Sequence, residues 1–388
     1  GQINDAALNE FCLWGELSLD GALRPTKGVL PVSMAAAHSS KKRLVVPYEN
    51  AKEAALVAQA VVYPVKTLRE TVELLHDKNN FVPFTVKTQE LFQENAKYPV
   101  DFQDVKGQYQ TKRALEVAVA GGHNALLIGP PGAGKTMLAK RIPTIMPDLT
   151  IEEALEVTRI HSTSGLIHPQ QGFIATRPYR NPHHTISDIA MVGGGTIPRP
   201  GEISLAHHGV LFLDELPEFH RNSLEALRQP LEDGQVRISR SHASLLFPSS
   251  FMLIAAMNPC PCGTQGIQKS PCRCSTTQIA RYRAKISGPL LDRIDIHIEV
   301  PAARYQELSS NLPAESSSCV KERVNKARAI QRKRFSDAGG KTEGIFCNAQ
   351  MTHKQVRKFC VLGKEENELL RMAMGELNFS ARAYDKIL

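Results

Sequence analysis

Short apolar runs, separated by glycine and polar residues, divide the middle of the chain. Residues 124–128, 210–213 and 251–256 are almost wholly apolar, which is typical of strands buried on both faces of a parallel sheet. The residues after the first run, 135–146, predict a helix. Residues 234–240 and 244–247 predict a β-hairpin. The pattern therefore indicates an α/β fold with a buried central sheet.

The N-terminal part predicts a smaller α/β unit over residues 1–76. Apolar residues alternate from Leu13 to Leu19, as in a half-buried strand, and Leu44 to Val46 predict a second strand. The Ala-rich stretches 28–38 and 50–60 are compatible with helices. Polar residues and prolines over 77–99 predict a linker. The α/β core is then expected over residues 100–314, and a helical domain over 315–388.

The composition is that of an ordinary globular protein, with 388 residues, 42% hydrophobic and 22% charged residues. No apolar run reaches the length of a membrane span, and no basic-then-apolar leader is present. These features predict a cytoplasmic protein that does not cross a membrane. The chain starts at Gly1 and stops at Leu388 inside a predicted helix, so we expect a fragment of a longer protein.

A glycine-rich loop follows the first apolar run and precedes the helix. Its glycines allow the backbone N–H groups to point at phosphate oxygens, and the start of a helix favours an anion there. Lys135 supplies a positive charge for the β- and γ-phosphates, and the Thr136 hydroxyl can bind Mg²⁺. This predicts a nucleoside-triphosphate site. The expected binding residues are Gly129, Pro130, Pro131, Gly132, Ala133, Gly134, Lys135, Thr136 and Met137.

Two carboxylates follow the second apolar run. Asp214 can hold Mg²⁺ and its water shell, and Glu215 can accept the proton of the attacking water. The alternative is that the two residues form only a surface Asp-Glu pair after a core strand. The presence of the phosphate-binding loop favours the catalytic interpretation over this alternative. The two motifs together predict hydrolysis of a nucleoside triphosphate with Mg²⁺.

Four of the eight cysteines form the pattern C-x-C, nine residues, C-x-C, within a loop at 258–275. Four thiolates can bind a structural zinc ion. Free thiols and disulfides are the alternatives, and disulfides are unusual in a cytosolic protein. The expected zinc ligands are Cys260, Cys262, Cys272 and Cys274.

The motifs around the loop resemble those of AAA+ ATPases. Residues 101–108, with Val105 and Gly107, resemble the segment on the adenine side of the nucleotide. Asn258 stands where these ATPases place a polar sensor. Leu290 to Asp295 is similar to the arginine-finger segment of the magnesium-chelatase branch, and Ser380-Ala-Arg382 resembles the second sensor. The resemblance implies a P-loop core with a helical lid, with Glu215, Asn258, Arg293 and Arg382 as catalytic residues.

Three further segments are similar to the YifB/ComM family of magnesium-chelatase-like ATPases: 177–185, 200–209 and 258–263. The resemblance covers essentially the whole chain. It implies a ring-forming ATPase, expected to be a hexamer, that drives DNA branch migration during natural transformation. A metal-insertion chaperone like the ATPase subunit of magnesium chelatase is the alternative from another class.

The resemblance also assigns roles that leave alternatives open. Asn258 would touch the attacking water or the γ-phosphate, or else be a strand-end turn residue. Arg293 would reach the ATP of a neighbouring subunit, or else pair with Asp292 or Asp295 within the chain. Arg382 would approach the phosphates from the lid of its own subunit.

Two inserts are candidates for DNA contact, since both face the central pore in this branch. The first carries Arg177, Arg180, His183 and His184, followed by Arg199; the predicted hairpin carries Arg237 and Arg240. Arg199, Arg237 and Arg240 would bind phosphates of single-stranded or branched DNA without reading sequence. The basic segment 321–334 is either another binding strip or a solvated helix face. The pairs His183-His184 and His207-His208 favour hydrogen bonding or packing over a metal site.

Residues 1–76 resemble part of the S5-like fold of the Lon protease domain, through Gly15 to Pro25 and the helix that follows. An ungapped comparison of this segment places Leu30 where Lon has its dyad lysine. Leucine cannot deprotonate a serine nucleophile. We therefore expect a degenerate structural or docking domain, and an ATP-dependent protease is a weaker alternative.

Overall fold

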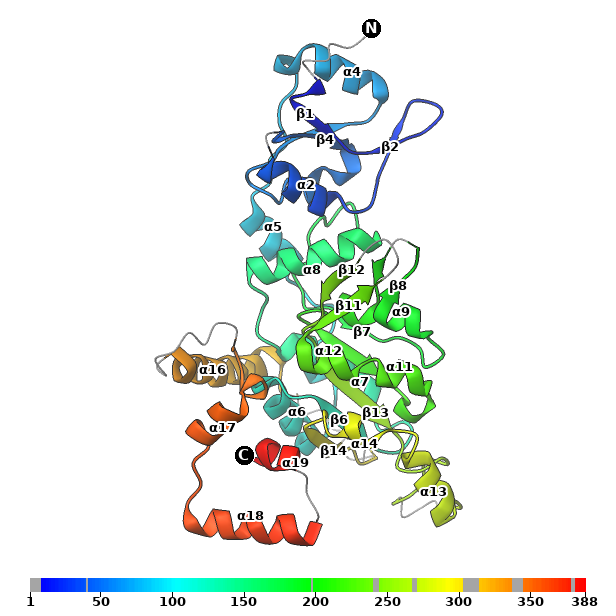
Figure 1. Cartoon of the computed structure of the whole chain (residues 1–388), viewed down its shortest axis with the longest axis vertical. Coiled ribbons are helices and arrows are strands. Elements are labelled where there is room, and N and C mark those ends of the chain that lie inside the picture. The colour runs from blue at the N-terminus through cyan, green and yellow to red at the C-terminus, as the bar shows by residue number, and fades with distance from the viewer. Residues whose placement is uncertain are drawn as a thin grey trace.

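The computed structural model describes residues 8–39, 41–196, 198–239, 244–266, 271–302, 314–336, 345–377 and 381–388. It shows an N-terminal α/β unit, a central α/β core and a C-terminal group of helices (Figure 1). No helix within these ranges has the length and apolar character needed to cross a membrane.

The core is built on a parallel sheet with the order β14-β6-β13-β10-β7. The strands are β14 (Ile296–Glu299), β6 (Ala125–Ile128), β13 (Met252–Met257), β10 (Val210–Leu213) and β7 (Tyr179–Arg180). Every residue of β10 and β13 is buried, as their continuous apolar runs predict. The predicted central sheet is thus confirmed, and all its carboxyl ends lie at one edge.

Helices cover both faces of this sheet. On one face α6 (Tyr109–Gly121), α7 (Lys135–Ile145) and α16 (Ser317–Ser336) pack on strand residues such as Leu127 and Phe212. The other face carries apolar residues of α10 (Glu202–Leu205), α11 (Arg221–Glu225) and α14 (Gly288–Leu291), with Tyr282 of α13 (Thr276–Arg283). The result is a three-layer core around the strands.

Two inserts extend from this core. The first contains α9 (Asp188–Val192), β8 (Gly193–Gly194), β9 (Arg199–Pro200) and α10. The second is the antiparallel hairpin of β11 (Gln235–Ser239) and β12 (Ser244–Pro248), which follows α12 (Arg228–Asp233). The predicted hairpin is therefore confirmed. A Cβ at Gly193 would lie 2.7 Å from the Ile238 side chain, so the two inserts are in contact.

The N-terminal unit has a parallel sheet of β1 (Phe11–Leu13), β4 (Arg43–Pro47) and β5 (Val61–Val65). Its helices are α2 (Val29–His38), α3 (Ala51–Ala54) and α4 (Leu68–His76). The strand predicted from Leu13 to Leu19 is wrong, because β1 ends at Leu13 and β2 (Glu16–Leu17) pairs with β3 (Leu23–Arg24) in an exposed hairpin. The predicted helix 50–60 is shorter, since the chain turns after Ala54 to enter β5.

Residues 77–99 are more ordered than the predicted linker. They contain α5 (Thr88–Asn95), whose Leu91 joins a buried cluster with Leu30 and Leu149. The cluster spans α2, α5 and α8 (Ile151–Ser164), which lie together in Figure 1. The sequence pattern did not reveal this helix, because most of its residues are polar and only one side of the short helix is apolar. The N-terminal unit is consequently packed on the core.

The C-terminal group continues from α16 with α17 (His353–Phe359), α18 (Lys364–Leu377) and α19 (Ala381–Ile387). The mainly helical character predicted for this part is confirmed. Helix α18 stands away from the core, whereas α19 returns to it beside β14 (Figure 1). Short 3-10 turns occur at Tyr48–Asn50, Lys78–Asn80, Phe102–Asp104, Leu216–Glu218 and Asn348–Gln350.

Candidate nucleotide site and the opposite edge of the sheet

The phosphate-binding loop joins the carboxyl end of β6 to α7. Gly132 and Gly134 have φ of 76° and 88°, a left-handed conformation that glycine adopts without strain. Gly129 has no room for a side chain, because a Cβ there would lie 2.2 Å from the carbonyl oxygen of Val300. The loop therefore needs glycine for both its turns and its close packing.

Lys135 is the first residue of α7 and lies inside the loop. Its ammonium group donates to the carbonyls of Gly129 (2.6 Å) and Pro130 (2.9 Å) and to Asn258 Oδ1 (3.1 Å). Burial lowers the pKa of Lys135, and the carboxylates of Asp214 and Glu215 oppose that shift. The structure thus brings together the lysine and the sensor asparagine that the sequence predicted separately.

The expected magnesium ligands lie side by side. The Thr136 hydroxyl donates to Asp214 Oδ2 at 2.6 Å, across the gap between α7 and the end of β10. A hydroxyl and a carboxylate are oxygen donors of the kind Mg²⁺ prefers. The residues present therefore fit this ion.

Glu215 has an unusual backbone. Its φ is 53°, one of three positive values among the described non-glycine residues, and such a conformation costs energy for a residue with a Cβ. Its N–H donates to Asp214 Oδ1 at 3.0 Å, which holds the Asp214 carboxylate against the turn. The turn directs the side chain toward the cavity at the phosphate-binding loop.

That cavity has a volume of about 430 Å³. It is lined by residues 131–137, Asp214, Glu215, Met257 and Asn258. Val105 and Gly107 do not line it, although the neighbouring Gln108 donates to the carbonyl of Ala133 at 3.3 Å. The predicted loop residues 131–137 and the magnesium ligands therefore share one cavity, whereas the predicted Gly129 and Pro130 do not line it and the adenine-side segment contacts the loop from outside.

His184 also reaches this site, which the sequence did not suggest. Its Nδ1 lies 3.3 Å from Glu215 Oε2, so the first insert touches the predicted general base. Strand β7, four residues earlier, pairs with β10. The sequence places a histidine after one strand and a glutamate after another, but only the strand order makes them neighbours.

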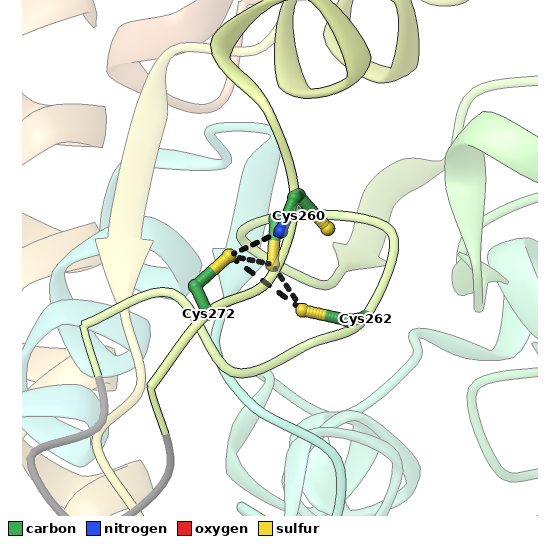
Figure 2. Close-up of side chains that lie close together, drawn as sticks. Cys260, Cys262 and Cys272 are labelled. Carbon is green, nitrogen blue, oxygen red and sulfur yellow. Dashed lines mark hydrogen bonds between the residues drawn. The ribbon is translucent and has the colours of Figure 1, made fainter.

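The cysteine loop follows Asn258 and packs on the phosphate-binding loop. Figure 2 shows Cys260, Cys262 and Cys272 converging, with Sγ–Sγ distances of 3.3, 3.6 and 3.6 Å. A tetrahedral zinc site with Zn–S bonds of about 2.3 Å requires sulfur separations of about 3.8 Å. Cys274 belongs to the same cluster, and all four thiols are free of disulfides. The geometry fits a four-thiolate metal site.

Arg293 lies at the other edge of the sheet. It follows α14 and precedes β14, and Asn124 at the amino end of β6 donates to its carbonyl at 2.9 Å. From there to Gly129 at the start of the phosphate-binding loop, five residue steps along β6 span roughly 16 Å. Arg293 therefore lies far from the nucleotide site of its own chain. Its guanidinium pairs with Glu232, and not with Asp292 or Asp295, the partners in the alternative interpretation of this residue.

Helix α19, which carries Arg382, is also at the amino edge. Lys386 pairs with Asp295, which accepts a second contact from His123 Nδ1 at 2.9 Å. The expected approach of Arg382 to its own phosphates does not fit this placement, because α19 packs at the opposite ends of the strands. The side chain of Arg382 itself lies outside the described residues.

A cavity of about 1510 Å³ opens at this amino edge. Residues of α12, α17 and α19 line it together with Arg293, Asp295 and the amino ends of the strands. It is a broad cleft between the core and the C-terminal helices. The two cavities thus lie at opposite edges of one sheet.

The predicted DNA residues divide into paired and unpaired ones. Arg177 is buried and donates to the carbonyls of Pro147, Asp148 and His208, and Arg180 forms a two-bond pair with Glu202. These two arginines are therefore structural. Arg199 and Arg237 are exposed and make no ion pair within the described ranges. Arg240 lies outside those ranges.

Helix α16 uses most of its positive charges internally. Lys321 pairs with Asp148, Arg323 with Glu116 and Glu315, and Lys326 with Glu322. Arg328 donates to the carbonyl of Val119 at 2.9 Å. Among the residues described on this helix, Arg332 and Lys333 are exposed without such a partner. The basic segment 321–334 therefore mainly stabilises the packing of α16 on the core.

His207 and His208 form a cluster with Glu156. Both Nε2 atoms lie near Glu156 Oε2, at 3.2 and 3.0 Å. His207 Nδ1 accepts from the backbone N–H of Ser250 at 3.0 Å, so its Nε2 must carry the proton when the ring is neutral. Burial lowers the pKa of His207 to about 4. A protonated Nε2 cannot bind a metal, and the cluster is held by hydrogen bonds.

Comparisons with known proteins agree with this architecture. A sequence model described as magnesium chelatase, subunit ChlI, matches residues 101–308; its C-terminal counterpart matches 314–388, and a further ChlI model matches 1–50. The chain therefore belongs to the magnesium-chelatase-like family of AAA+ proteins.

Within this family the chain is similar to the competence protein ComM of Haemophilus influenzae, with 42% identity over 395 residues that cover all of this chain and 74% of ComM. It is also 42% identical to YifB of Escherichia coli over 388 residues, covering all of this chain and 73% of YifB. The chain thus belongs to the YifB/ComM branch. A part of it, 38% of its length, is 27% identical to 28% of Lon protease 2 from Bacillus subtilis.

Proposed function

We propose that this chain hydrolyses ATP within a ring of copies and uses the energy to move single-stranded or branched DNA. The observation that carries the ATPase part is the shared cavity of Lys135, Thr136, Asp214, Glu215 and Asn258. Mg²⁺, held by Thr136 and Asp214, would neutralise phosphate charge. Glu215 would accept a proton from water, and Asn258, fixed by Lys135, would orient that water.

A ring is supported by the position of Arg293. An arginine at the amino edge cannot reach a nucleotide at the carboxyl edge of the same sheet. It could reach one held by a neighbouring copy that docks at the large cleft. Because this contact joins two different surfaces, repeated contacts close into a ring if the rotation allows it. Six copies are the number we propose.

DNA as the substrate is supported by the similarity to ComM, which is named a competence protein, and by the two exposed arginines. Arg199 and Arg237 stand on inserts that touch each other through Gly193 and Ile238. We propose that both contact phosphates and that the ring acts as a branch-migration helicase in transformation or recombination. Such contacts give affinity that falls steeply with salt.

The test is binding of a labelled four-way junction and of single strands over a salt series. Replacing Arg237 and Arg240 by Gln should reduce the salt slope by up to about two, and DNA stimulation of the ATPase should fall. The matched control replaces Lys41 and Lys42, exposed cations of the N-terminal unit, and should leave the slope unchanged. Equal slopes for wild type and the hairpin variant would contradict DNA contact by the hairpin.

A magnesium-chelatase-type chaperone is the second candidate, favoured by the family models that match most of the chain. An assembled ring that binds no DNA at low salt would support it. Proteolysis is disfavoured by Leu30, which is fully buried in the cluster between α2 and α8. In that position Leu30 helps to pack the N-terminal unit on the core.

We further propose that the four cysteines hold a structural zinc ion, with about one ion per chain by elemental analysis. The cysteine loop is in contact with the phosphate-binding loop, since a Cβ at Gly263 would lie 2.7 Å from Pro131. A bound zinc ion would therefore make the cysteine loop a rigid support for the phosphate-binding loop. Cys272→Ser should lose the metal, and Cys319→Ser, an exposed thiol of α16, should retain it. A metal-free protein with an unchanged unfolding temperature would contradict this proposal.

A further inference from the structure

The side chain of Arg293 is held inside its own chain. Nη2 donates to Glu232 Oε1 and Nη1 donates to the carbonyl of Pro289, both at 2.5 Å. Only 11% of the side chain is exposed, and its buried Nε has no hydrogen-bond partner within the described residues. An arginine in this position cannot at the same time extend into the nucleotide site of a neighbour.

The partner that holds it stands directly before the hairpin. Glu232 belongs to the last turn of α12, and Gly234 turns the chain into β11 with φ of 64°. The carbonyl of Gly234 accepts from Ser249 at the end of β12, at 2.8 Å. Both strands of the hairpin are therefore anchored next to Glu232, and a tilt of the hairpin must displace the end of α12.

The strength of the ion pair suits a reversible contact. The side chain of Glu232 is 42% exposed, and an ion pair whose carboxylate is open to solvent is weak enough to be exchanged for another. A phosphate of a neighbouring nucleotide carries more negative charge than a carboxylate and offers arginine the same two-bond geometry. Displacement of Glu232 would therefore favour transfer of Arg293 to the phosphate.

We propose that Glu232 is a positioning residue that keeps Arg293 away from the neighbouring nucleotide until the hairpin contacts DNA. The proposal rests on the function proposed above, because it takes Arg293 as the residue that acts on a neighbour. It adds a route by which contact between DNA and the second insert, the β11–β12 hairpin, would release Arg293. The first insert touches Glu215 through His184 and provides a separate contact.

The experiment measures ATP hydrolysis by the assembled protein with and without DNA. Glu232→Gln keeps the side-chain length and removes the charge. It should raise the DNA-free kcat about fivefold, the factor expected from losing an ion pair whose carboxylate is open to solvent, with little change in KM. The ratio of DNA-stimulated to DNA-free rates should fall accordingly. Asp233→Asn makes the same charge change one residue later, away from Arg293, and should alter neither quantity.

A double variant separates the proposed role from a general structural effect. Arg293→Ala combined with Glu232→Gln should hydrolyse ATP no faster than Arg293→Ala alone. A DNA-free rate that is unchanged or lower in Glu232→Gln, or a gain that persists without Arg293, would overturn the proposal. If DNA does not stimulate the wild type, the proposed DNA function fails, whereas the DNA-free rates still test the role of Glu232.

Discussion

The two edges of the central sheet carry different chemistry. At the carboxyl edge a small cavity of about 430 Å³ collects a lysine, a hydroxyl, two carboxylates and an amide. At the amino edge a cleft of about 1510 Å³ carries Arg293 and the helix of Arg382. The first edge has every group needed to bind ATP and activate water. The second has the positive charge that would stabilise the transition state, and no phosphate-binding loop.

Under the proposed function, one copy holds both halves of a catalytic site but cannot combine them. Parallel strands impose this, because all their carboxyl ends lie at one edge and all their amino ends at the other. A ring brings unlike edges together at each contact between neighbours. Separate changes at the two edges should therefore have separable effects.

The largest effect is expected at the amino edge. Arg293→Ala should lower kcat for ATP about a thousandfold, because a missing arginine finger leaves transition-state charge unneutralised. Nucleotide affinity should stay near that of the wild type, since Arg293 is far from the phosphates of its own chain. Hydrolysis rates and binding of a fluorescent ATP analogue check both points. A large loss of affinity would place Arg293 in the binding site of its own chain.

At the carboxyl edge, Glu215→Gln should lower kcat about a hundredfold or more while leaving ATP binding intact. The amide keeps the size of the side chain and cannot accept the proton. Lys135→Ala is the contrasting variant, since it should weaken binding itself. A Glu215→Gln rate above a tenth of the wild-type rate would show that another group is the base.

A smaller effect concerns stability of the amino edge, where His207 precedes β10. Burial lowers its pKa from 6.5 to about 4, so between these values the unfolded chain binds a proton that the folded chain does not. The free energy of unfolding is therefore greatest above pH 6.5 and falls as the pH drops toward 4. Between pH 7 and pH 5 the loss is about 2 kcal/mol.

Urea unfolding at these two pH values measures that loss. His207→Asn keeps an acceptor for the N–H of Ser250 and does not titrate in this range, so its pH dependence should be flatter than that of the wild type. His168→Asn, at an exposed loop position, is the control and should retain the wild-type dependence. Equal dependence in His207→Asn and wild type would assign the loss to other groups.

The carboxyl edge was largely predictable from the sequence. Its residues follow apolar runs directly, so a parallel sheet must bring Lys135, Asp214 and Asn258 together. The cysteine loop was predictable from spacing alone. The order of the strands, which makes His184 a neighbour of Glu215, is not encoded in any local pattern.

The amino edge was less predictable for the same physical reason. The partners of Arg293 and Asp295 come from α12 and α19, which are distant in the chain, and a charge pattern does not select among distant partners. For an Arg293 paired within its own chain the sequence offered only the nearby aspartates as partners, and the structure shows Glu232. It also suggested DNA contact for Arg177, whose burial among carbonyls could be recognised only after folding.

The most direct test mixes two inactive variants. Arg293→Ala retains a complete carboxyl edge, and Glu215→Gln retains a complete amino edge. In mixed rings some contacts unite the intact halves, and equal mixing should restore about a quarter of the wild-type rate if neighbours assort at random. Native mass spectrometry of the mixture must show rings that contain both variants. Recovery of hydrolysis in such rings is the predicted result; no recovery at any mixing ratio would contradict a catalytic site shared between two copies.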